Sequence, residues 1–127
     1  MSRPDEIQAN LERAESSFQA AQLLLASGFA DDAASRAYYA AFHAASALLV
    51  SRGLNFNSHA GVLRAISLNF VKTGQLDRSM GKDLNWLAEL RQLSDYGELR
   101  RVSRANAEEA LVIAARFMSA VRAVLEP

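Results

Sequence analysis

Five polar side chains follow one face of a segment that is otherwise almost entirely apolar. The segment DDAASRAYYAAFHAASALLVS covers residues 31–51, and its polar residues recur every three or four positions: Asp32, Arg36, Tyr39, His43 and Ser46. This spacing places them on one face of a helix. A buried polar group is costly without a partner, so another part of the chain must match this polar stripe.

The best match lies near residue 91. Arg91 and Asp95 are one helical turn apart, on the edge of their helix that also carries leucines. We expect them to face Arg36, Tyr39 and His43 across a pair of helices. Two interpretations stay open: a buried network that fixes the register of the helices, or a functional pocket. Arginine suits bidentate phosphate contacts, which is the chemistry that such a pocket would offer.

Motifs for other chemistries are missing from the sequence. The two histidines show no metal-ligand spacing, and there is no cysteine, glycine-rich phosphate loop or nucleophile elbow. His43 has no ligand partner at helical spacing, and we expect His59, just inside a helix start, to be a surface or capping residue. The sequence therefore predicts neither a metal nor a cofactor.

The composition predicts one globular domain over residues 1–127. Half of the residues are hydrophobic, and the net charge is zero, which argues against a generally basic nucleic-acid binder. Twelve of the fourteen basic residues are nevertheless arginines, the side chain that suits phosphate. A polar N-terminal stretch and the lack of a long apolar run predict a soluble, cytoplasmic protein without a membrane segment.

The apolar spacing predicts helices and no sheet. Four main helices and one short helix should form an antiparallel up-and-down bundle, with the alanine-rich segment at its centre. Glycines at 28 and 53 should end the first two helices, and Ser58 should cap the third. The expected ranges are 4–26, 31–52, 59–70, 76–96 with room for an irregularity at Gly81, and a last helix capped by Ser103 or Asn106. The apolar face of that last helix is expected to consist of Leu111, Ala114, Ala115, Met118, Val121, Val124 and Leu125.

Four segments in register resemble the HEPN superfamily: SRAYYAAFHAASALLVSRG, NSHAGV, FVKTGQLD and LAELRQLSDYG. They are most similar to small stand-alone HEPN proteins paired with minimal nucleotidyltransferases, the UPF0332-like branch. The resemblance covers about residues 6–120. It implies a helical bundle that forms a homodimer, often with a pocket at the dimer cleft.

The resemblance also implies an activity, because many members of the superfamily are metal-independent endoribonucleases. Their signature is an arginine followed four to six residues later by a histidine. The arginine falls on Arg91, with Gln92 as its polar neighbour, whereas the histidine is absent and Tyr96 stands in its place. Arg91 would hold the phosphate, Asp95 or Tyr96 would complete the catalytic set, and Arg36, Tyr39 and His43 would line or brace the pocket.

Related pairs act as toxin–antitoxin modules in which the partner adds nucleotides to a tyrosine near the signature. By analogy the partner here would be a minimal nucleotidyltransferase, Tyr96 its candidate acceptor, and RNA or a nucleotide the ligand. The alternative is a non-catalytic adaptor that binds a nucleotide or substrate for the transferase.

Overall fold

The computed structural model describes residues 2–96 and 101–126, including the backbone of Tyr96 but not its side chain. This part of the chain contains helices and no strand, as predicted. The elements are α1 (Arg3–Ala26), α2 (Ala30–Ser51), α3 (His59–Ile66), the π-helix η1 (Ser67–Val71), α4 (Arg78–Tyr96) and α5 (Arg104–Leu125). None of these helices combines the length and the apolar character that a bilayer-spanning segment needs.

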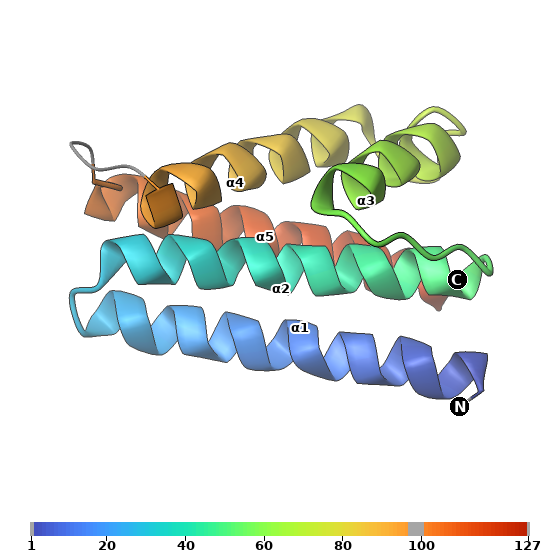
Figure 1. Ribbon diagram of the computed structural model, residues 1–127, viewed down its shortest axis with the longest axis horizontal. Coiled ribbons are helices and arrows are strands. Elements are labelled where there is room, and N and C mark those ends of the chain that lie inside the picture. Colours follow the sequence, from blue (N-terminus) through green and yellow to red (C-terminus); the bar gives the residue numbers. More distant parts are fainter. Residues whose placement is uncertain (1, 97–100, 127) are drawn as a thin grey trace.

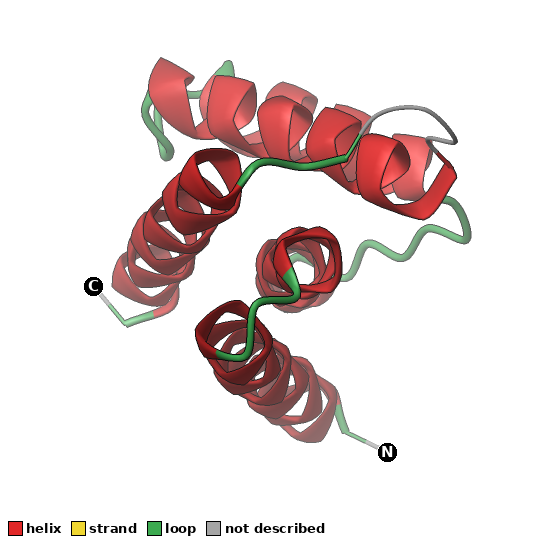
Figure 2. Cartoon of the chain, turned by 90° about the vertical axis from the view of Figure 1, so that its left-hand side faces the viewer, coloured by secondary structure: helices red, strands yellow, loops and turns green. Residues whose placement is uncertain are grey.

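The four long helices alternate in direction along the bundle (Figure 1). Helix α1 runs one way, α2 returns beside it, and α4 and α5 repeat the alternation, with the short α3 and η1 at one end. Helix α2 contacts α1, α3, α4 and α5 and lies in the middle of the end-on view (Figure 2). The up-and-down bundle and its alanine-rich central helix are therefore confirmed.

Small side chains explain why α2 can hold this central position. Most of its buried residues are alanines, which let neighbouring helix backbones approach closely without cavities. Tyr38 differs from these alanines, since it is a large polar-tipped side chain that is only 1% exposed. Its hydroxyl group must therefore find a partner inside the protein.

Local signals set most of the helix ends where the sequence predicted them. Gly28 and Gly53 follow α1 and α2 with φ angles of 86° and 72°, a conformation that favours glycine. Ser58 caps α3 by accepting a hydrogen bond from the Gly61 amide at 3.0 Å. Ser103 caps α5 in the same way, whereas Asn106 only supplies the amide that donates to Ser103.

Two expectations about the middle of the chain are wrong. Helix α4 begins at Arg78 rather than at 76 and runs through Gly81 without interruption. The irregularity lies instead in the preceding helix, where Ser67–Val71 widens into a π-helix. A β-carbon on Gly81 would stand 3.4 Å from a methyl group of Val71, which is an ordinary van der Waals contact. The predicted end of α4 at Gly97 lies outside the described residues.

The expected apolar face of α5 is also partly wrong. Ala115 is exposed, whereas Ala110, Ile113 and Phe117 are buried. Helix α5 packs against α1, α2 and α4, and these three neighbours together determine which of its faces is covered. The spacing of apolar residues along α5 alone could not predict which alanines these neighbours cover, since alanine occurs both at surfaces and in cores.

A contact between distant segments fixes where α5 starts. The Val102 amide donates a hydrogen bond of 2.7 Å to Asp31 Oδ1 in the first turn of α2. Val102 itself is buried, and Arg101 adds an ion pair with Asp31 at 3.5 Å. The start of α5 is thereby tied to the start of α2.

Candidate functional site

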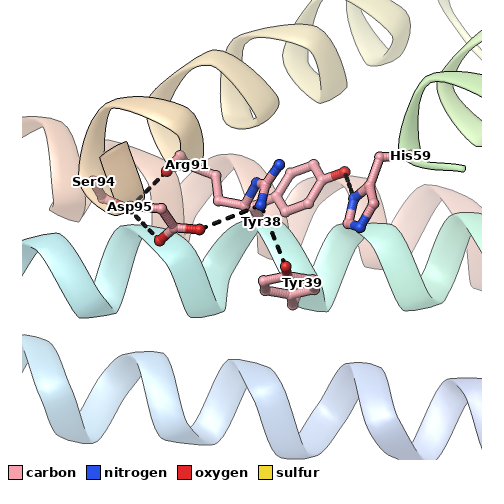
Figure 3. Close-up of polar contacts among 6 residues, drawn as sticks. All are labelled: Tyr38, Tyr39, His59, Arg91, Ser94 and Asp95. Atoms are coloured by element: carbon pink, nitrogen blue, oxygen red, sulfur yellow. Dashed lines mark hydrogen bonds and ion pairs between the residues drawn. The ribbon is translucent and has the colours of Figure 1, made fainter. Parts of the chain in front are cut away.

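The polar stripe of α2 meets α4 and the start of α3 in one group of side chains. Figure 3 shows its central members, which come from three helices and point toward one another. We call this group the aromatic–arginine cluster. It consists of Arg36, Tyr38, Tyr39, Phe42, His43, His59, Arg91 and Asp95.

Arg91 connects α4 to the tyrosines of α2. Its Nη1 atom donates to the Tyr39 hydroxyl at 3.4 Å and to Asp95 Oδ2 at 3.3 Å (Figure 3). Its guanidinium carbon lies 5.2 Å from the Tyr38 ring centroid and 5.8 Å from that of Tyr39, within range of cation–π attraction. The side chain is 13% exposed, so it lies at the margin of the core, where the helical spacing placed it.

Arg36 and His43, the other members of the polar stripe in this cluster, contact Tyr39 in different ways. The guanidinium carbon of Arg36 lies 4.6 Å from the Tyr39 ring centroid, so Arg36 joins through that ring. His43 packs against Tyr39 and Phe42, with ring centroids 6.3 and 5.8 Å apart. Tyr39 links the stripe to Arg91 by direct contact.

Three members were missed by the sequence reasoning, namely Tyr38, Phe42 and His59. The Tyr38 hydroxyl and Nδ1 of His59 form a hydrogen bond of 2.6 Å (Figure 3). The His59 ring also stacks on Phe42, with centroids 4.4 Å apart and planes inclined by 22°. His59 is therefore a half-buried member of the cluster, not the surface or capping residue that was expected. The sequence signal was its place directly after the cap Ser58, where the first turn of α3 can face α2.

Burial keeps these groups in their neutral forms. It raises the pKa of Tyr38 to about 12, so the hydroxyl keeps its proton at neutral pH. Burial, and then the positive charge of Arg91, lowers the pKa of His59. The pKa of His43 is lowered by burial and then by Arg13, Arg36 and His59. Both imidazoles are thus uncharged at neutral pH.

These lowered histidine pKa values predict a loss of stability on acidification. The unfolded chain takes up protons at the ordinary histidine pKa of about 6.5, whereas the folded chain resists them until a lower pH. The free energy of unfolding should therefore fall as the pH drops below about 6.5. Urea unfolding at pH 7, 6 and 5 measures this effect, and the double variant His43→Asn/His59→Asn should flatten it.

The two histidines are the only ones in the chain, so the double variant removes this titration completely. Hydrogen bonds from Ser79 lower the pKa of Asp77 from its ordinary value of 3.8. Its titration therefore does not change the free energy of unfolding between pH 5 and pH 7. Equal free energies of unfolding of the wild type at pH 7 and pH 5 would contradict the conclusion that both histidines are uncharged in the folded protein.

The cluster carries more positive than negative charge. It contains two arginines, Arg36 and Arg91, and one carboxylate, Asp95, whose Oδ1 also accepts a hydrogen bond from Ser94 at 3.2 Å. Gln92 is exposed, and the side chain of Tyr96 lies outside the described residues. Half-buried arginines among aromatic rings suit a phosphate flanked by bases, because guanidinium binds the anion and the rings can stack.

A separate hollow of about 410 Å³ lies outside this cluster. It is lined by Phe56, Ser58, Ala60, Gly61, Arg64, Ala65, Leu68 and Asn69. Its lining is mainly apolar and contains no histidine, carboxylate or tyrosine among the described residues. The groups that could do chemistry are therefore in the aromatic–arginine cluster and not in this hollow.

Comparisons with known proteins agree on one family and one fold. Residues 7–124 match the family model of the HEPN domain. A UPF0332 protein of Thermotoga maritima is 39% identical over 90% of this chain and 86% of its own length. A Methanocaldococcus jannaschii protein named "Putative toxin MJ0605" is 35% identical over 96% and 90%. The crystal structure of TT1696 from Thermus thermophilus superposes with a TM-score of 0.81, at 22% identity, over 98% of this chain and 99% of that one.

Proposed function

Since the chain belongs to the HEPN family, in its UPF0332 branch, we propose that it is a toxin-like protein that cleaves RNA without a metal ion. The observation that carries this proposal is the position of Arg91. Its guanidinium lies at the core margin against the rings of Tyr38 and Tyr39, and these rings also contact the neutral His59 and Arg36. The name of the archaeal relative supports a toxin-like role.

The chemistry of such a cleavage suits this set of residues. When the ribose 2′-hydroxyl attacks the adjacent phosphorus, negative charge grows on the phosphoryl oxygens, and a guanidinium placed there stabilises it. A neutral imidazole with a pKa below the working pH can accept a proton. Asp95 orients Arg91 through the ion pair at 3.3 Å, which keeps the planar donor group directed at its ligand.

The test is incubation of the purified protein with a mixed-sequence RNA in EDTA. We expect cleavage that leaves 5′-hydroxyl ends, because the attacking group is the neighbouring 2′-hydroxyl rather than a metal-bound water. A folded protein that leaves the RNA intact would contradict the nuclease and favour the adaptor that binds a nucleotide for a transferase. An activity that EDTA abolishes would show that a metal ion takes part.

We also propose that the protein acts as a homodimer with a minimal nucleotidyltransferase partner. The motif pattern shared with paired HEPN proteins supports this partner, and a dimer would bring two clusters to one RNA. Tyr96, the last residue of α4, follows Arg91 by five positions and is the proposed acceptor of nucleotides from the transferase.

A further inference from the structure

His59, a histidine outside α4, contacts the same two tyrosine rings as Arg91 and is held in a defined orientation. We propose that His59 faces a phosphodiester bound at Arg91 and takes the proton of its 2′-hydroxyl, with Tyr38 as the residue that positions the imidazole. This inference rests on the proposed RNA-cleaving function of the aromatic–arginine cluster. It assigns the proton transfer to α3, whereas the signature motif would place it on α4.

The local structure fixes the His59 ring from several sides. Ser58 caps the helix and so sets where α3 begins, one residue before the imidazole. Tyr38 binds Nδ1 at 2.6 Å, and Phe42 stacks on the ring at 4.4 Å. Nε2 forms no hydrogen bond with the described residues, so it is the nitrogen available to a ligand.

The same two tyrosine rings connect His59 with Arg91. The His59 centroid lies 5.6 Å from that of Tyr38 and 5.8 Å from that of Tyr39. The Arg91 guanidinium carbon lies 5.2 and 5.8 Å from these same centroids. A phosphate held by Arg91 beside these rings would therefore bring its ribose toward His59.

The charges around His59 suit a base. The positive charge of Arg91 on α4 acts on it, and α2 contributes the neutral Tyr38 and His43, so this charge favours the neutral imidazole. In the tautomer whose Nδ1–H donates to the Tyr38 oxygen, Nε2 carries a lone pair. His59 is thus ready to accept a proton at neutral pH.

The proposed step balances without any further reactant. The 2′-oxygen bonds to phosphorus as the bond from phosphorus to the 5′-oxygen breaks, and the 2′-hydroxyl proton moves to Nε2 of His59. The departing 5′-oxygen takes a proton from water, and the imidazolium returns its own to the hydroxide so formed. The products are a 2′,3′-cyclic phosphate and a 5′-hydroxyl.

Other members of the cluster fit this role less well. Tyr38 has its pKa raised to about 12, so its phenolate is scarce at neutral pH. Asp95 is occupied by Arg91 and Ser94. His43 lies nearer to Arg13 and Arg36 and has no recorded hydrogen bond that would orient it among the described residues.

The deciding variant is His59→Asn, which keeps a polar atom for Tyr38 near the position of Nδ1 but removes Nε2. We expect RNA cleavage to fall about 10²–10⁴-fold and the acidic limb of the pH profile of kcat/KM to disappear. Tyr38→Phe should lower cleavage less and shift that limb, because it removes only the positioning hydrogen bond. Arg64→Lys, an exposed residue of the same helix, serves as the control with wild-type cleavage.

A second measurement separates this inference from the proposed function. Uridine 3′-monophosphate is added while the His59 ring signals are titrated by NMR. A bound phosphate should raise the His59 pKa, and Arg91→Ala should abolish that rise. Wild-type cleavage with an equally active His59→Asn variant overturns the inference alone. A wild type that does not cleave RNA overturns the proposed function. If the His59 pKa also does not rise when uridine 3′-monophosphate is added, the proposed position of His59 beside the bound phosphate is overturned as well.

Discussion

Arg91→Ala should lower RNA cleavage by about two to three orders of magnitude while the bundle stays folded. The guanidinium lies against the rings of Tyr38 and Tyr39 and donates to the Tyr39 hydroxyl at 3.4 Å. Its removal takes away the positive charge that would stabilise the developing phosphoryl charge. Initial rates on one defined RNA in EDTA measure the loss, and circular dichroism verifies the helices.

A second arginine of the same bundle provides the matched control. Arg116 pairs with Asp83 of α4 at 2.8 Å on a more exposed part of the surface. Arg116→Ala also removes an ion pair to α4, yet it should cleave RNA as the wild type does. Arg91→Lys keeps the charge but loses the planar bidentate donor, so its rate should lie between those of wild type and Arg91→Ala.

These variants also separate function from structure. If Arg91→Ala unfolds the protein while Arg91→Lys folds and cleaves normally, Arg91 serves the register of the helices rather than catalysis. A folded Arg91→Ala that cleaves at the wild-type rate would remove Arg91 from the proposed site altogether.

Phe117→Ala should lower the free energy of unfolding by about 3–5 kcal/mol. The phenyl ring of Phe117 on α5 is fully buried, and truncation would leave a cavity among side chains of a close-packed core. Urea unfolding monitored by circular dichroism measures the loss.

The same substitution at an exposed position shows whether burial is the cause. Phe29, between α1 and α2, is 56% exposed, and Phe29→Ala should change the free energy of unfolding by no more than about 0.5 kcal/mol. Equal losses at both positions would show that the core around Phe117 is looser than the structure indicates.

Local chemistry made much of the fold predictable. Gly28, Gly53, Ser58 and Ser103 act within one turn of the chain, so their effects on helix ends can be read from neighbouring residues. The central place of α2 followed from its composition, because a helix that is apolar nearly all round must be covered on all sides. The buried face of α5 and the π-helix did not follow, because both depend on which elements pack against them.

Some features of the candidate site could likewise be predicted from the sequence, and others could not. Helical spacing by itself placed Arg91 and Asp95 on one face of α4, because residues three or four apart share a face whatever the fold, whereas the contact of Arg91 with Tyr39 depends on how α4 packs on α2. The hydrogen bond between Tyr38 and His59 spans a chain separation of 21 residues and depends on how α3 folds back onto α2. Sequence spacing carries no information about that angle. The amino-acid sequence therefore determined the helices and which residues line their faces, and only the tertiary structure decided that His59 contacts the same two tyrosine rings as Arg91.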